Sequence, residues 1–171
     1  MSAGRSLGQI LVDADEHIPD GRPYLPGRVD SWLERRFAWQ AIKYLRPEVE
    51  LRSQVDIATE GGTFRVDFLT AGYRVNLAFE CDGAAYHTDP KRDADRDGWL
   101  LRSEDLWGIY HLPYRDLVEY PEWCFLGIAE RHYVLFTDSG LVNLRTLTQR
   151  FDGPTRLRMS YRCKATPNAD G

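Results

Sequence analysis

The sequence predicts an α/β protein in which a mixed central sheet is flanked by helices. The 171 residues fit a single domain, and their hydrophobic content of 43% is enough to build a core. The strongest local patterns follow one another in the order helix, three strands, helix, strand. The apolar run at 75–79 is nearly continuous, which is typical of a central strand buried on both faces.

The first helix is expected at residues 31–45. Ser31 and Glu34 have the spacing of a capping box, and Pro47 cannot continue a helix, so both ends are marked. One stripe of this segment is apolar and is predicted to face the core: Leu33, Phe37, Ala41, Tyr44 and Leu45.

Three strands are expected next. Residues 50–58 and 63–69 alternate between apolar and polar side chains, and a glycine-rich turn at 60–62 joins them as a hairpin. A second turn leads into residues 74–79, the predicted central strand. This strand therefore delivers Glu80 and the residues after it to its far end.

The rest of the chain is expected to hold a second helix, a fourth strand and a less regular C-terminal part. Asp89 and Pro90 mark the start of the helix. The patterns after it predict a strand at 107–112, a short helix at 113–119, a helix or loop at 121–130, and strands at 133–137, 141–144 and 155–162. We therefore divide the chain into a mostly irregular segment at 1–29, a core at 30–120 and a C-terminal extension at 121–171 that packs on the same domain.

Composition excludes several classes of protein. No stretch approaches eighteen consecutive apolar residues, so no membrane span and no membrane partner are expected. The N-terminus lacks the residue order of a secretory signal, and the three cysteines form neither a CxxC pair nor an even set. We therefore expect a cytoplasmic protein. The net charge of −4 argues against a protein that coats nucleic acid, although residues 131–164 hold seven basic and two acidic residues.

Acidic residues stand at the ends of two predicted neighbouring strands. Asp67 belongs to the second strand of the hairpin, and Glu80 follows the central strand. Two carboxylates brought together repel unless a cation neutralises them, and oxygen ligands of this kind suit Mg²⁺, with Mn²⁺ as a substitute. Such an ion assists phosphodiester cleavage. The alternative is that Asp67 is a strand-edge acid and that residues 80–82 are an ordinary polar loop.

These acids belong to a longer series of short motifs. The series runs Ser31-x-x-Glu34, Gln54-Val55, Arg65-Val66-Asp67-Phe68, Leu77-Ala78-Phe79-Glu80-Cys81-Asp82-Gly83 with Tyr86-His87, and Arg92-Asp93 to Arg96-Asp97. Together the motifs resemble the PD-(D/E)XK nuclease superfamily, within it the branch of the very-short-patch repair endonuclease and its Vsr-like relatives. The resemblance covers about residues 31–119. It implies a restriction-endonuclease-like core, here followed by a small C-terminal extension that contains strands.

The resemblance also implies roles for individual residues. Asp67 and Glu80 correspond to the two metal-binding acids, and Glu34 to a helix acid that completes the site. Asp82 stands where the superfamily usually has lysine, which leaves the water-activating role unassigned. His87 corresponds to a histidine beside the scissile phosphate. These residues form the predicted catalytic set: Glu34, Asp67, Glu80, Asp82 and His87.

Each assignment has a structural alternative. Glu34 can act only as part of the capping box, and His87 can be a solvent-facing loop residue. Cys81 is placed among the candidate metal ligands with Asp67 and Glu80. However, strand alternation points its side chain away from Glu80, so the alternative for Cys81 is packing in the core.

The predicted nucleic-acid contacts come from three parts of the chain. They are Gln54 at the hairpin, Arg92 and Arg96 on the second helix, and Arg156 and Arg158 in the alternating segment 155–162. Most charges on a helix are simply solvated, and the alternating segment suits a protein interface as well as a nucleic acid.

Taken together, the sequence predicts a Mg²⁺-dependent endodeoxyribonuclease that acts in DNA repair or in defence against foreign DNA. Its expected partner is DNA, with RNA as another substrate, alongside a helicase, a methyltransferase or another repair or defence protein. The competing hypothesis is a catalytically inactive module of the same fold that binds nucleic acid or assembles with partners. The aspartate at position 82, in place of lysine, keeps this alternative open.

Overall fold

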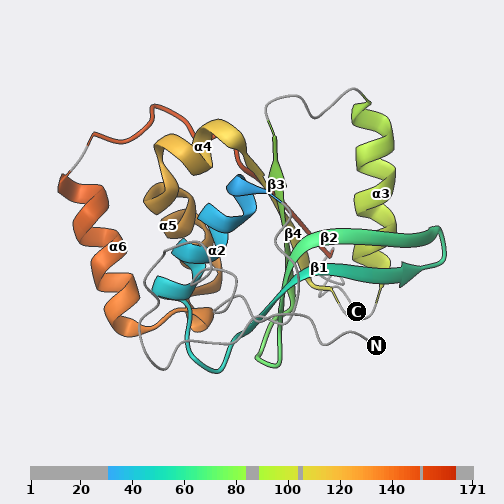
Figure 1. Ribbon diagram of the computed structural model, residues 1–171, viewed down its shortest axis with the longest axis horizontal. Coiled ribbons are helices and arrows are strands. Elements are labelled where there is room, and N and C mark those ends of the chain that lie inside the picture. The colour runs from blue at the N-terminus through green and yellow to red at the C-terminus, as the bar shows by residue number, and fades with distance from the viewer. Residues whose placement is uncertain (1–30, 84–88, 104–105, 151, 165–171) are drawn as a thin grey trace, which may run out of the picture.

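The computed structural model of the chain describes residues 31–83, 89–103, 106–150 and 152–164. These residues form a mixed α/β fold with a five-stranded sheet and helices on both of its faces, so the predicted fold class is confirmed at this level (Figure 1). The elements are α2 (Trp32–Tyr44), β1 (Glu50–Thr59), β2 (Gly62–Ala71), β3 (Leu77–Asp82), α3 (Pro90–Arg102), β4 (Gly108–Pro113), α4 (Tyr114–Glu119), α5 (Pro121–His132), η1 (Tyr133–Leu135), α6 (Asp138–Arg150) and β5 (Ser160–Cys163).

The strands lie in the order β1-β2-β3-β4-β5. The pairs β1–β2, β2–β3 and β4–β5 are antiparallel, whereas β3 and β4 are parallel. Because parallel neighbours need a crossover, the chain passes through α3 between β3 and β4. The C-terminal strand β5 completes the sheet along β4, so the extension shares the sheet of the core.

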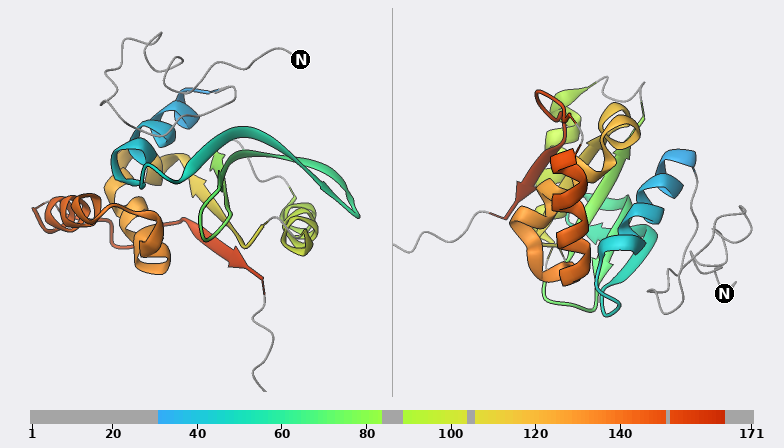
Figure 2. Two further views of the ribbon diagram at one scale, coloured as in Figure 1. Left: turned by 90° about the horizontal axis from the view of Figure 1, so that it is seen from below. Right: turned by 90° about the vertical axis from the view of Figure 1, so that its left-hand side faces the viewer.

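Two hydrophobic cores cover the two faces of the sheet. The larger core lies beneath α2, α5 and α6 and is centred on Phe37, whose ring lies 4.9 Å from Phe68, 5.0 Å from Phe79 and 5.3 Å from Phe125. The smaller core joins Leu100 of α3 to Ile57 and other residues of β1, β2 and β4. Figure 2 shows how the long β1–β2 hairpin curves from the α2 side towards α3.

The predicted first helix is confirmed as α2. Ser31 caps it, because its hydroxyl oxygen accepts a hydrogen bond from the Glu34 backbone N–H at 3.1 Å. The cap fixes the first turn, which carries the buried Glu34 side chain. The start of the helix therefore positions a predicted site residue.

We expect Ser31→Ala to lower the free energy of unfolding by about 1 kcal/mol, because one helix N–H loses its acceptor. Urea denaturation measures the change. Ser160→Ala serves as the control, since Ser160 is an exposed residue of β5 and lies at no helix end. Equal stability of the two variants would contradict a capping role for Ser31.

The strands predicted at 133–137 and 141–144 are wrong. The structure has the 3₁₀ helix η1 followed by α6 in this region. Thr137 gives the reason, because its hydroxyl accepts a hydrogen bond from the Gly140 N–H at 3.0 Å and so caps a helix where a hairpin turn was expected. Leu144 and Thr148 then repeat at helical spacing as buried residues.

The segment 155–162 is only partly a strand. β5 covers Ser160–Cys163, and the residues before it are irregular. The backbone N–H groups of Arg158 and Met159 donate to the Asp116 carboxylate at 2.5 and 2.8 Å, so an aspartate takes the bonds that a neighbouring strand would have made. The predicted alternation in burial nevertheless persists, with arginines exposed at 156, 158 and 162.

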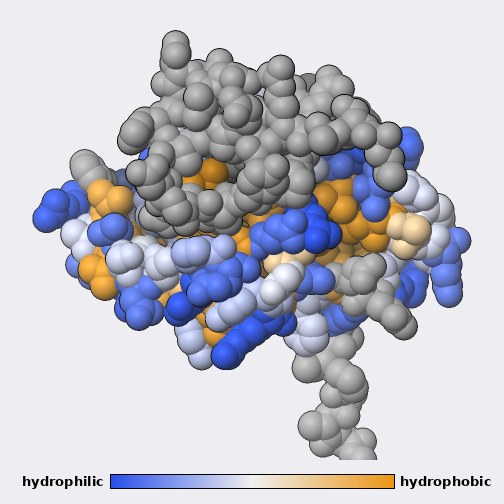
Figure 3. Space-filling view, turned by 60° about the horizontal axis from the view of Figure 1, so that its bottom comes forward, coloured by the Kyte–Doolittle hydropathy of each residue, from blue (hydrophilic) through white to orange (hydrophobic). Residues whose placement is uncertain are grey.

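The molecular surface is mixed in character. On the face shown in Figure 3, apolar side chains are interspersed with hydrophilic ones. Among the described residues, no helix is long and apolar enough to cross a membrane.

Candidate active site

The candidate site lies where β2 and β3 separate. Their ladder consists of the pairs Phe68↔Phe79 and Leu69↔Ala78, so Asp67 and Glu80 are the first residues beyond its end. At this point the Asp67 carboxylate accepts a hydrogen bond from the Cys81 backbone N–H at 2.7 Å. The side chain of Asp67 thus fills the opening between the strands and brings its charge next to Glu80.

Gln54 connects Asp67 to α2. Its side-chain amide donates to a Glu34 carboxylate oxygen at 2.8 Å and, more weakly, to Asp67 at 3.4 Å. Gln54 lies opposite Asp67 on β1 and has a φ of 52°, a left-handed conformation that is rare for a residue other than glycine. Such strain concentrates at functional sites, where the surroundings hold it in place. The structure therefore brings three predicted site residues together: Glu34, Gln54 and Asp67.

Glu80 is buried, with 8% of its surface exposed, and it pairs with Arg96 of α3. One guanidinium nitrogen of Arg96 donates both to Glu80 Oε1 at 2.5 Å and to the Arg65 carbonyl oxygen at 2.6 Å. Arg96, predicted as a nucleic-acid contact, thus has an internal partner in this structure. Arg92, one turn earlier, is exposed at the start of α3.

The two acids have unusual protonation properties. Burial raises the pKa of Asp67 to about 6, against the lowering effect of the hydrogen bond from Cys81, and the charges of Glu34 and Asp82 raise it further. Burial likewise raises the pKa of Glu80 to about 7, although Arg96 opposes the shift and Asp67 adds to it. Burial therefore disfavours the ionised form of both acids, and a bound cation would relieve this cost.

The Asp82 and Cys81 side chains have other partners in the structure. Asp82 Oδ2 lies 3.5 Å from His111 Nδ1. This distance is longer than a good hydrogen bond, so the contact is an ion pair. The Cys81 side chain packs against the larger core, and burial raises the pKa of its thiol. This contact with the core favours the packing alternative for Cys81.

His111 is a partly buried residue that the sequence did not single out. It lies directly across from Glu80 in the β3–β4 register, and its Nε2 lies 2.9 Å from Asp97, which is itself 1% exposed. Burial alone would lower the pKa of His111, but the hydrogen bond to Asp97 and the neighbouring Asp82 carboxylate outweigh it and raise the pKa to about 10. His111 is therefore a partly buried cation between two acids, and Arg162 of β5 approaches Asp97 at 3.4 Å.

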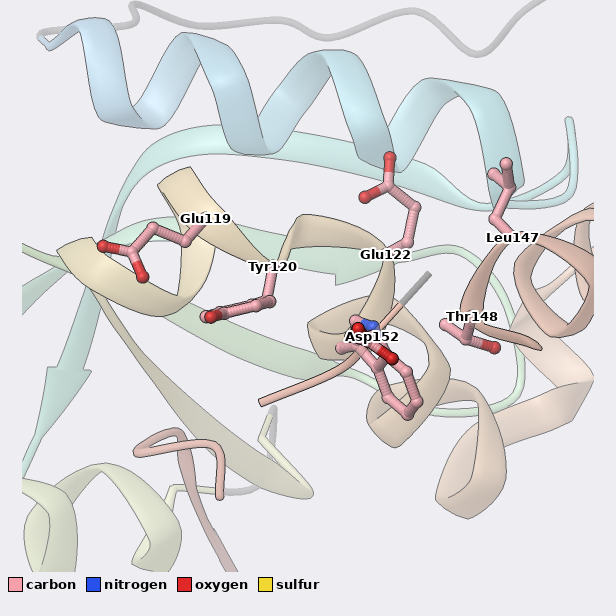
Figure 4. Close-up of a pocket in the computed structure, with 7 residues that line it drawn as sticks. Glu119, Tyr120, Glu122, Leu147, Thr148 and Asp152 are labelled. Atoms are coloured by element: carbon pink, nitrogen blue, oxygen red, sulfur yellow. The ribbon is translucent and has the colours of Figure 1, made fainter. Parts of the chain in front are cut away.

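Two predicted contacts lie elsewhere. Arg156 and Arg158 line a separate cavity beside α4 and contact none of the residues at the β2–β3 opening through a hydrogen bond or ion pair among the described residues. His87, the predicted phosphate neighbour, lies outside the described residues. A cavity of about 290 Å³ between α4, α5 and α6 is lined by Glu119, Glu122 and Asp152, and it contains none of the predicted residues (Figure 4).

The donor chemistry of Asp67 and Glu80 fits Mg²⁺. Within the parts of the chain that the structure describes, no group of three histidine, cysteine or acidic side chains is arranged to hold a metal ion. Mg²⁺ does not require such a group, because it is commonly held by one or two carboxylates together with waters and substrate phosphates. Asp67 and Glu80 offer these carboxylates, and Glu34 and Gln54 hold Asp67 in place.

Comparison of the chain with protein-family models, with curated proteins and with solved structures found no match.

Proposed function

We propose that the chain is a Mg²⁺-dependent endonuclease of the PD-(D/E)XK type that hydrolyses phosphodiester bonds in DNA. The observation that carries the proposal is the placement of Asp67 and Glu80 at the point where β2 and β3 separate, with the pKa of both acids raised by burial. Two carboxylates held in this way favour a divalent cation.

Each residue of the site has a distinct part in this proposal. Asp67 and Glu80 hold the ion, while Gln54 and Glu34 keep Asp67 in its orientation. Asp67 and Glu80 would hold Mg²⁺ where its charge would stabilise a reacting phosphate. Arg96 balances the charge of Glu80 from the other side. The motif series favours a role in DNA repair or defence, with a helicase or methyltransferase among the candidate partners.

A catalytically inactive nucleic-acid-binding or assembly module is the second candidate. The Arg96–Glu80 ion pair favours it, because an internal cation already neutralises one of the two acids. Asp82 favours it as well, since this acid faces His111 and no lysine occupies its position.

Cleavage of a supercoiled plasmid separates the two candidates. We expect the purified protein to nick or linearise the plasmid in Mg²⁺ or Mn²⁺ and to be inactive in EDTA. Glu80→Gln, purified in parallel, reports the background from contaminating nucleases and should show no activity above it. Equal activity of the wild type and Glu80→Gln would refute the nuclease proposal. A labelled RNA of matched sequence tests the other substrate.

A further inference from the structure

A second charged site lies at the junction of α4 and the segment that precedes β5. It is a cavity of about 370 Å³, and three arginines line it: Arg115, Arg156 and Arg158. Tyr120 and Thr155, both of which carry a hydroxyl group, also line this cavity. Guanidinium and hydroxyl groups are hydrogen-bond donors that match the oxygens of an anion.

The cavity is held in shape by buried contacts. Asp116 of α4 is 2% exposed, and its carboxylate accepts the backbone N–H groups of Arg158 at 2.5 Å and Met159 at 2.8 Å. At the other end, the backbone at Gly153 lies so close to Trp123 that a Cβ atom there would be 2.3 Å from the indole ring. The segment that carries the arginines is thus fixed before a ligand binds, which reduces the entropy lost on binding.

The arginines are available to a ligand. Arg156 and Arg158 are exposed, and no described acidic side chain forms an ion pair with either of them. Arg115 pairs with Glu119 at 3.1 Å, but both side chains are about half exposed. Exposed pairs of this kind contribute little, so a phosphate can replace Glu119 at small cost.

The cavity lies at the same edge of the sheet as the acids. Because β3 and β4 are parallel, both end at this edge, and Asp82 lies opposite Pro113 in their register. α4 begins at the next residue, Tyr114, so Arg115 lies just beyond the strand end beside the acids. In Figure 1, α4 and the end of β3 are seen on the same side of the molecule.

We propose that this arginine pocket binds a backbone phosphate of the nucleic acid whose scissile bond lies at Asp67 and Glu80. The inference rests on the proposed function for the identity of the polymer. Arginine binds phosphate through two parallel hydrogen bonds, and such a contact positions the strand without reading its sequence. The pocket therefore supplies affinity and direction at a distance from the metal ligands.

Binding measured in EDTA tests the pocket independently of cleavage. A fluorescein-labelled DNA duplex is titrated with the full chain, and fluorescence anisotropy is followed over a range of salt concentrations. We expect the double variant Arg156→Ala/Arg158→Ala to bind DNA about 10-fold more weakly, because a phosphate contact is lost. For the same reason, the plot of the log of the association constant against log salt should become less steep by about 1. The loss should be similar for duplexes of unrelated sequence.

Two further variants make the result specific. Arg145→Ala/Arg150→Ala removes the same charge from exposed positions on α6 and should leave the salt slope nearly unchanged. Arg156→Lys/Arg158→Lys keeps the charge and should restore most of the slope. Equal losses in the pocket and α6 variants would overturn the proposal, as would a wild type that binds inorganic phosphate but no DNA. Pocket-dependent binding in EDTA by a protein that leaves the plasmid intact in Mg²⁺ and in Mn²⁺ would instead support the pocket and refute the nuclease.

Discussion

Asp67→Asn is expected to abolish cleavage and, at the same time, to stabilise the protein at pH 8. The variant loses one of the two carboxylates that we assign to Mg²⁺. Because a metal ion contributes several kcal/mol of transition-state stabilisation, activity should fall by about 10³-fold or more. Asparagine keeps an oxygen that can accept the hydrogen bond from the Cys81 N–H, so the backbone contact survives.

The gain in stability follows from the raised pKa of Asp67. Its pKa rises from 3.8 to about 6 on folding, so its ionised form is destabilised in the folded protein. Protonated Asp67 therefore makes its full contribution to folding stability below the unfolded pKa, and this contribution is lost as pH rises through the folded pKa. At pH 8 the charge therefore costs about 1–3 kcal/mol, and Asp67→Asn removes that cost. At pH 4 the difference between wild type and variant should largely disappear.

Urea denaturation at the two pH values measures the difference in stability, and plasmid cleavage measures activity. Asp56→Asn is the matched control, because Asp56 is an exposed acid on β1 whose pKa is lowered by the hydrogen bond from Arg65. That variant should cleave normally and should gain no stability at pH 8. Added Mg²⁺ should raise the melting temperature of wild type and of Asp56→Asn, but not that of Asp67→Asn. Destabilisation of Asp67→Asn at both pH values would contradict our account of this acid.

Local signals predicted the elements that form the site. The Ser31 cap, the alternation of the hairpin and the apolar run before Glu80 each depend on residues close together in sequence. Together they place Asp67 and Glu80 beside one another once β2 and β3 pair. The resemblance added Glu34 and Gln54, which no local pattern connects to Asp67. Their hydrogen bonds span 20 and 13 residues of the chain.

The partners of Arg96 and His111 could not be predicted, because they depend on contacts between elements that are distant in sequence. Arg96 looked like one charge among many on a solvated helix, and only the packing of α3 on the sheet directs it to Glu80. His111 belongs to an alternating strand, where a polar residue normally faces solvent. α3 covers that face and supplies Asp97, so His111 is enclosed. One signal in the sequence could have identified His111: it lies on the strand predicted to neighbour the one that leads to Glu80, in register with this acid.

His111→Leu is expected to lower the free energy of unfolding at pH 7 by about 3 kcal/mol, because it removes the imidazolium between the buried Asp97 and the partly buried Asp82. Arg162 still lies 3.4 Å from Asp97, so that acid keeps one cationic neighbour. Asp97→Asn combined with His111→Leu should cost less than the sum of the single variants, since the double variant no longer buries the charge of Asp97 without the imidazolium.

The dependence on pH distinguishes this charge network from simple packing. The pKa of His111 rises from 6.5 to about 10 on folding. The charged imidazole therefore makes its full contribution to folding stability below the unfolded pKa, and this contribution is lost as pH rises through the folded pKa. The gap in stability between wild type and His111→Leu should therefore narrow between pH 7 and pH 10. His132→Leu is the control, because burial lowers the pKa of His132 and this histidine is neutral throughout that range. Its cost should stay constant, and a constant cost for His111→Leu as well would show that His111 acts by packing alone.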